Sequence, residues 1–181
     1  MIDHDTSLLL GRLVLGHSVA SLATLHDGRP FASMIPYAVL VTGRDPRGGD
    51  DGDGGDNAGS VVLVSHVSRL SAHTRDMLAT PEVCLLVTAS ESIDSTGPPP
   101  QALPRVSLPA QATFIDSAHP AYEVLKQAYL GRFPHAAGWF QLGDFSIVIF
   151  EPTSARFIAG FARAMTLSPQ QLHAAVAAAG S

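Results

Sequence analysis

The sequence has very little lysine and cysteine, and both shortages restrict its chemistry. Lys126 is the only lysine among 11 basic residues, so a bound phosphate must be met by arginine, histidine, hydroxyl or backbone N–H groups. Cys84 is the only cysteine, and it lies in the apolar run Val83-Cys84-Leu85-Leu86-Val87. A single cysteine excludes an intrachain disulfide and a cysteine-based zinc site. Its apolar neighbours predict a buried, inert thiol.

Long apolar runs and an excess of basic residues are also missing. No stretch approaches the roughly 20 apolar residues of a membrane span, and the first residues have no signal-peptide pattern. We therefore expect a cytoplasmic protein that does not enter the membrane. The formal net charge of -5 argues against non-specific nucleic-acid binding, which needs a basic surface. A chain of 181 residues can bury a sizeable core, and we expect one domain over residues 1–181.

Several enzyme motifs are absent. The sequence has no Gly-x-Ser-x-Gly elbow, no Gly-x-Gly-x-x-Gly after a strand and no Walker pattern. Residues 43–59 are rich in glycine and aspartate and poor in apolar side chains, which predicts a mobile loop. Asp51, Asp53 and Asp56 alternate as calcium ligands do, but the complete loop pattern and its closing glutamate are missing.

The apolar pattern predicts a mainly β fold. Two β-like runs, 18–25 and 31–41, flank Asp27-Gly28, which is a strong hairpin signal, and Pro36 indicates an edge, a bulge or a point where pairing is interrupted. Strands seldom alternate with helices along the chain, so we expect a six- or seven-stranded antiparallel barrel with peripheral helices. The other predicted strands are 61–64, 83–88, 105–115, 145–150 and 156–158, and the predicted helices are 6–16, 118–131 and a C-terminal one over 166–181.

Residues 65–78 are the most informative segment. They hold four hydroxyl side chains, two imidazoles and two guanidiniums, and they follow the β-like run 61–64. We interpret them as the opening turns of a helix. A helix start offers unpaired N–H groups and the positive end of the dipole, so this segment predicts an anion site, with phosphate as its natural ligand.

The two histidines of this segment allow a second interpretation. His66 and His73 are seven residues apart, which would place them near one helical face, but a metal site would need further ligands. We favour His66 as a strand-end residue and His73 as a donor at the helix start. We therefore predict no metal site.

The order of several short sequence words resembles the FMN-binding split β-barrel family, the superfamily of pyridoxamine 5'-phosphate oxidase. The branch it resembles most is that of the haem-utilisation proteins. Each word is weak alone, but their order covers residues 7 to 165. The words are Ala20-Ser21-Leu22-Ala23-Thr24, Ala32-Ser33-Met34-Ile35-Pro36-Tyr37-Ala38, Leu70-Ser71-Ala72-His73-Thr74-Arg75, Arg105-Val106-Ser107-Leu108, Arg132-Phe133-Pro134, Gly143-Asp144-Phe145 and Gly160-Phe161-Ala162-Arg163-Ala164.

The resemblance implies a split barrel that forms a homodimer, with two FMN sites at the subunit interface. It also implies which residues contact the cofactor. Ser33, Met34, Ile35 and Pro36 would line the isoalloxazine and the ribityl chain, Val64 and Ser65 would lie at the strand end, and Ser71, His73, Thr74 and Arg75 would face the phosphate.

The chain departs from the family pattern in three places. Many relatives have lysine where this chain has His73, so we expect phosphate affinity to fall above neutral pH as the imidazole loses its charge. Ala162 replaces a usual glycine in the haem-contacting word, and the haem-degrading members are longer, with an extra domain that we do not expect in this chain. Arg105 and Arg156 are candidates to pair with a substrate anion or to be surface charges, and we expect Trp139 to fill core space.

Three functional hypotheses follow. The first is a flavin-dependent oxidoreductase with an unknown small or haem-like substrate. The second is a haem-binding or haem-utilisation protein without flavin turnover, in which a histidine is the axial iron ligand. The third is a structural dimer without cofactor. Because FMN carries the electron chemistry, no side chain is assigned as catalytic.

Overall fold

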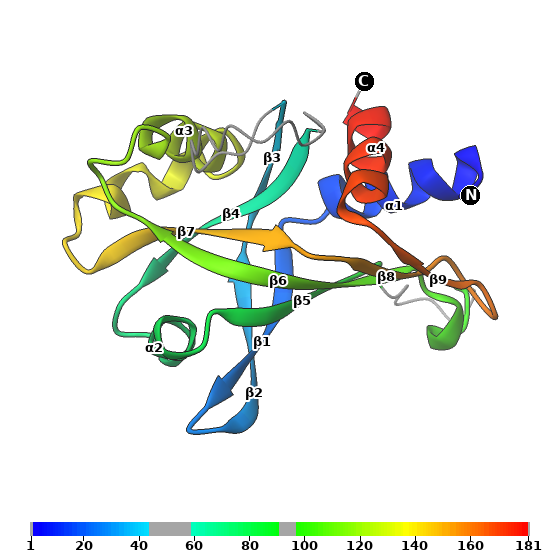
Figure 1. Cartoon of the computed structure of the whole chain (residues 1–181), viewed down its shortest axis with the longest axis horizontal. Coiled ribbons are helices and arrows are strands. Elements are labelled where there is room, and N and C mark those ends of the chain that lie inside the picture. The colour runs from blue at the N-terminus through cyan, green and yellow to red at the C-terminus, as the bar shows by residue number, and fades with distance from the viewer. Residues whose placement is uncertain (1, 44–58, 91–96, 181) are drawn as a thin grey trace, which may run out of the picture.

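The computed structural model describes residues 2–43, 59–90 and 97–180. In these residues one nine-stranded sheet forms the centre of the molecule, with the order β2-β1-β5-β6-β7-β4-β3, while β8 pairs with β6 and β9 (Figure 1). All of the strand pairs are antiparallel. The strands are β1 Val19–His26, β2 Arg29–Pro36, β3 Ala38–Thr42, β4 Ser60–Ser68, β5 Glu82–Thr88, β6 Arg105–Ile115, β7 Phe145–Pro152, β8 Ala155–Ile158 and β9 Ala164–Leu167.

The sheet curves into a barrel that remains split between β2 and β3. These two strands are the ends of the hydrogen-bonded order, although they follow one another in the chain through Tyr37. Pro36 has no N–H to continue the pairing. The Tyr37 backbone turns away and donates to the Ser18 carbonyl, while its buried hydroxyl donates to the Val14 carbonyl at 2.8 Å. The predicted interruption at Pro36 is therefore confirmed.

Helices cover the barrel from outside (Figure 1). α1 and α4 pack on each other at one end, whereas α3 and the 3-10 helix η2 lie over β4 and β7. β4 is buried on both faces because Val61 and Leu63 enter one core cluster and Val62 and Val64 enter the second, below α3. The helices are α1 His4–Gly16, α2 Ala72–Ala79, η1 Pro100–Ala102, α3 Tyr122–Arg132, η2 Pro134–Gln141 and α4 Pro169–Gly180.

The predicted fold class is confirmed, but the predicted number of six or seven strands is wrong. The run 31–41 forms two strands, because Pro36 and Tyr37 divide it. The segment Ala164–Leu167 forms β9, a short strand that was not predicted. It pairs only with β8 at the margin of the sheet, where a four-residue strand leaves little periodicity to detect.

The boundaries of all three predicted helices also differ from the structure, and α3 begins at Tyr122 rather than at residue 118. α1 begins at His4, and its cap is Asp3, which accepts the Thr6 N–H at 2.9 Å. The C-terminal helix begins at Pro169 because β9 occupies the residues up to Leu167. Ser168 and Gln171 cap it reciprocally, as a capping box requires. Most of the predicted loop 43–59 lies outside the described residues.

The environments of Trp139, Cys84 and Ala162 can be compared with the expectations from the sequence. Trp139 does not fill the core, since its side chain is 42% exposed on η2. Cys84 is only half-buried, although burial still raises the pKa of its thiol. Ala162 has a φ of 60°, in the left-handed region that glycine adopts more readily, which explains why a glycine would fit there.

In the described part of the chain no helix is long and apolar enough to span a membrane.

Candidate functional site

The informative segment 65–78 divides between a strand and a helix. β4 continues to Ser68, so Ser65 and His66 are strand residues, and the interpretation of the whole segment as helix is wrong. The helix α2 starts at Ala72, with Ser71 in an extended conformation as its N-cap. The strand extends this far because Ser65, His66, Val67 and Ser68 all pair with β7. The favoured interpretation of the two histidines agrees with this geometry.

The start of α2 offers free hydrogen-bond donors. The N–H of Arg75 makes the first intrahelical bond, to the Ser71 carbonyl, so the amides of Ala72, His73 and Thr74 have no partner in the preceding turn. The Ser71 side chain makes no capping bond to this turn. These amides and this hydroxyl therefore remain available to an anion from outside the helix.

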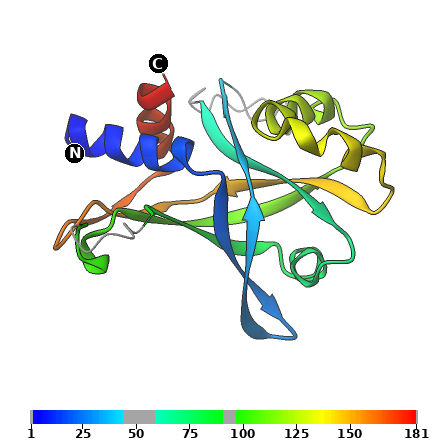
Figure 2. The same cartoon turned by 180° about the vertical axis from the view of Figure 1, so that it is seen from behind.

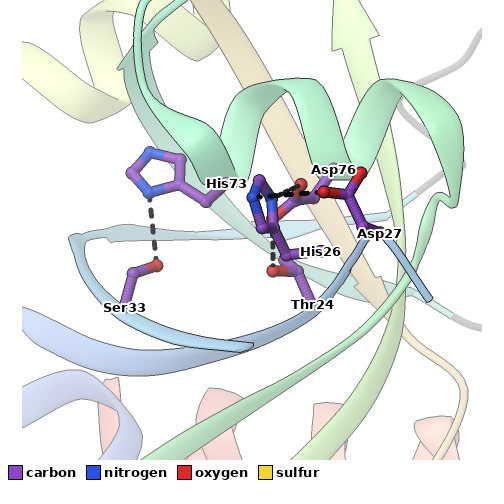
Figure 3. A network of polar contacts seen from close by, with 6 residues as sticks. All are labelled: Thr24, His26, Asp27, Ser33, His73 and Asp76. Atoms are coloured by element: carbon purple, nitrogen blue, oxygen red, sulfur yellow. Dashed lines mark hydrogen bonds and ion pairs between the residues drawn. The ribbon is translucent and has the colours of Figure 1, made fainter. Parts of the chain in front are cut away.

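Strand β2 contributes the opposite side of this site. Ser33 Oγ lies 3.2 Å from His73 Nδ1, although the two residues are 40 positions apart in the sequence (Figure 3). If the Ser33 hydroxyl donates, the neutral imidazole carries its proton on Nε2 and offers it to a ligand. Burial lowers the pKa of His73, against an opposing effect of Asp76, so the neutral form dominates near neutral pH without an anion. We call Ser33, Ser71, His73 and the first-turn amides of α2 the anion site.

A second polar group fixes α2 on β1 from below (Figure 3). The Asp76 carboxylate is buried and accepts two bonds, from Thr24 Oγ1 at 2.9 Å and from His26 Nδ1 at 2.8 Å. The bond to Asp76 raises the pKa of His26. Burial acts to raise the pKa of Asp76, but the bonds from His26 and Thr24 outweigh it and leave that pKa lowered. We call Thr24, His26 and Asp76 the Asp76 network.

Sequence reasoning missed the Asp76 network. Thr24 and His26 alternate on β1 just before the hairpin turn, so both side chains point to the same face. This spacing was a usable signal for a polar contact on the concave side of the sheet. Asp76 gave no signal of its own, because a carboxylate in a short helix is more often exposed to solvent.

The other predicted cofactor residues have different environments. Met34 is exposed by 61%, and the Pro36 carbonyl accepts a bond from the buried Ser65 hydroxyl at 2.7 Å. The side chains of Ile35 and Val64 point into the core, each in a different cluster. Thr74 is fully buried and donates to the Ser68 carbonyl, whereas Arg75 is exposed on α2.

His66 belongs to a separate, aromatic region. Its ring stacks on Phe140 with centroids 3.8 Å apart and also contacts Phe145 and Tyr129; we call these four residues the aromatic cluster. Among the described residues its Nδ1 has no hydrogen-bond partner, and burial lowers its pKa to about 4. Within the described ranges, no group of three or more His, Cys, Asp or Glu side chains is arranged to hold a metal ion.

One face of the sheet is apolar and uncovered. Val19, Leu25, Met34 and Leu86 point outward from β1, β2 and β5 and are 37–61% exposed. The strand register places them on one surface, because Ser21 pairs with both Met34 and Leu86. Seen from behind, the β1–β2 hairpin extends beyond the rest of the sheet beside α2 (Figure 2). We call these four residues the outer face.

The chain is similar to known proteins both in sequence and in structure. The chain is 31% identical over 157 residues to the heme oxygenase HOZ, a chloroplast protein of Arabidopsis thaliana. That match covers 84% of this chain but only 40% of the relative, so this chain spans less than half of that protein.

Two solved structures share the fold. A heme binding protein from Mycobacterium smegmatis superposes with a TM-score of 0.73 and 21% identity over 96% of this chain and 62% of that one. A protein of the pyridoxinephosphate oxidase family from Clostridium acetobutylicum gives a TM-score of 0.61 and 10% identity, over 94% and 99% of the two chains. The predicted split-barrel fold is confirmed by these likenesses. The family model described as CREG, beta-barrel matches residues 11–174, and the chain therefore belongs to the CREG beta-barrel family.

Proposed function

We propose that this chain binds FMN at the anion site and acts as a flavin-dependent oxidoreductase. The observation that carries the proposal is the 3.2 Å contact between Ser33 and His73, which brings strand β2 and the start of α2 together and so supports a shared anion position beside them. When bound, FMN would supply the hydride or electron transfer. The residues of this chain bind and orient it.

The donors of the anion site suit a phosphate monoester. A phosphate has several acceptor oxygens, and the site presents the hydroxyls of Ser33 and Ser71, the imidazole of His73 and the first-turn amides of α2. Arg75 follows Thr74 in α2 and adds a positive charge. No lysine takes part, so the affinity depends on groups whose hydrogen bonds are directional.

The remaining contacts follow the direction of β2. Met34 and Pro36 come next after Ser33 and are accessible, so we assign them to the ribityl chain and the ring. Ile35 and Val64 have core side chains, and their contribution is limited to the backbone. The bond from Ser65 to the Pro36 carbonyl holds the end of β2 in place. Thr74 supports the helix start through Ser68 rather than touching the phosphate with its hydroxyl.

The outer face supports a homodimer. An antiparallel sheet with one solvated face normally presents polar side chains there, whereas β1, β2 and β5 present Val19, Leu25, Met34 and Leu86. A second copy of the chain would bury these residues; Met34 adjoins Ser33 in β2, and the two side chains point to opposite faces of that strand. Sedimentation of the Leu86→Glu variant tests this assignment, with Val124→Glu on the exposed side of α3 as its control.

Haem is the second candidate ligand. The names of the Arabidopsis and Mycobacterium relatives refer to haem, and the chain is similar to both. The β8–β9 turn, Gly160 to Ala164, is the segment that resembles a haem-contacting word, and it presents Phe161 with 80% exposure. An exposed aromatic ring is suited to the face of a porphyrin. In this alternative, haem is a substrate or a cargo.

The visible spectrum of the purified protein distinguishes these candidates. Quenching of FMN fluorescence at one equivalent per chain, with flavin bands that shift on binding, supports the proposed function. A Soret band that forms with haemin while FMN is not bound supports the second candidate. A protein that binds neither at micromolar concentration contradicts both.

A further inference from the structure

We infer that Asp76 is a positioning residue for the phosphate ligand, because it fixes the first turn of α2 on strand β1. The inference rests on the proposed function, since the ligand is the phosphate at the anion site. Asp76 touches no part of that site directly; it acts through His73, which precedes it by nearly one helical turn.

The position of α2 depends on contacts with the sheet. α2 has only eight residues, and a helix of this length is not stable alone in water. Met77 is buried beneath it, but apolar packing is not directional, and the buried Thr74 hydroxyl bonds only to the Ser68 carbonyl at the end of β4. The two bonds to Asp76 are directional, and they connect α2 to residues 50 and 52 positions earlier in the sequence.

The β1–β2 hairpin carries both the residues that bind Asp76 and the residue that contacts His73. Thr24 and His26 hold Asp76 from β1, and Leu22 of β1 pairs with Ser33 of β2. Movement of α2 relative to β1 would therefore change the 3.2 Å contact between Ser33 and His73. A displacement of about 1 Å is enough to weaken a group of directional bonds to one ligand.

Stability alone does not account for a carboxylate at this position. The side chain of Asp76 is 5% exposed and that of His26 is 44% exposed, and such a pair contributes little net stability, because solvent screens the imidazole and desolvation of the carboxylate offsets the attraction. A carboxylate close to an anion site also repels the ligand, unless a cation compensates it. His26 supplies that compensation when it is protonated, and the bond to Asp76 raises its pKa. We therefore explain the Asp76 carboxylate, despite its desolvation and its repulsion of an anion, by the position in which it holds α2 on β1.

The test combines FMN titration with hydrogen exchange of the ligand-free protein. In Asp76→Ala we expect the Kd for FMN to rise at least tenfold and the hydrogen-bonded amides of α2, from Arg75 onward, to exchange at least tenfold faster. In Thr24→Val, which keeps the ion pair, we expect a twofold to fivefold effect on both. Asp76→Asn retains the shape and one acceptor, so it should restore part of the FMN affinity and part of the exchange protection relative to Asp76→Ala.

Asp27→Asn is the matched control, because Asp27 lies 3.8 Å from His26 but is exposed. In this variant the Kd for FMN and the exchange rates should stay within twofold of the parent.

Each result has a definite meaning. The inference is overturned if Asp76→Ala, or Thr24→Val should the first variant fail to fold, binds FMN as the parent does. If the parent itself binds no FMN, the proposed function fails, and hydrogen exchange still decides the positioning role. Unchanged exchange of the α2 amides would then overturn it, whereas faster exchange that is confined to α2 would support it.

Discussion

His66 and His73 are seven residues apart in the sequence, but the structure places them in two regions with opposite chemistry. His73 lies at the start of α2 within hydrogen-bond distance of Ser33, close to the Asp76 network. His66 lies on β4 and stacks on Phe140, with its Nδ1 unpartnered among the described residues. The comparison shows that the imidazole itself does not indicate function; a binding histidine is recognised by directional partners and access, and a packing histidine by its aromatic neighbours.

The largest expected effect is on ligand binding in the polar region. The double variant Ser71→Ala with His73→Ala removes two donors of the anion site, and we expect FMN affinity to fall at least about 100-fold, since bonds to a charged group contribute about 1.5–3 kcal/mol each. The thermal midpoint should change little, because neither side chain is in the core. Fluorescence titration measures the effect, with His135→Ala on η2 as the control. Retention of FMN with parental affinity shows that the phosphate assignment is wrong.

The next effect is on stability, and it belongs to the aromatic region. Phe140→Ala removes the ring stacked on His66, so we expect the free energy of unfolding to fall by about 2–3 kcal/mol. FMN affinity should stay within twofold of the parent. Urea unfolding and FMN titration of the same preparation measure both quantities. An equal loss in both would show that the two regions are not independent.

The pH dependence of stability provides a further test of the aromatic region. The pKa of His66 is lowered to about 4, so on acidification the unfolded chain takes up its proton first, starting near 6.5. The free energy of unfolding should therefore fall between about pH 6.5 and 4, by up to about 3 kcal/mol. In His66→Leu this part of the decline should disappear. Chemical denaturation across this range decides the matter, and an unchanged slope in the variant rules out His66 as the cause.

The smallest expected effect is the pH dependence of binding. Protonated His73 offers two donors and a charge, so its contribution to FMN affinity should decline as pH rises and the imidazole becomes neutral. The phosphate of FMN also titrates, near pH 6, and acts in the opposite direction. The parent and His73→Gln should be titrated side by side from pH 5.5 to 8.5. We expect their affinities to differ about threefold more at the acid end, and parallel profiles would contradict a role for the His73 charge.

The sequence predicted the fold class because alternation, the Asp27-Gly28 turn and Pro36 are local signals. It did not predict where β4 ends. Ser65, His66 and Ser68 are polar side chains, which are common at helix starts. Only the pairing of residues 65–68 with β7 shows that they belong to a strand. The network of Thr24, His26 and Asp76 joins segments 50 or more positions apart, so the spacing of Thr24 and His26 on β1 indicates a polar contact but does not identify Asp76 as its partner. Ser33 and His73 were named from a resemblance, and the structure brings them together.

The central claim is that the contact between β2 and the start of α2 binds the phosphate of FMN. Comparing the Kd of FMN with that of riboflavin, which has the same ring and ribityl chain without the phosphate, measures this most directly. We predict that FMN binds at least tenfold more tightly to the parent protein, and that the difference disappears in the Ser71→Ala, His73→Ala double variant. Equal affinities of the parent for FMN and riboflavin would contradict the account.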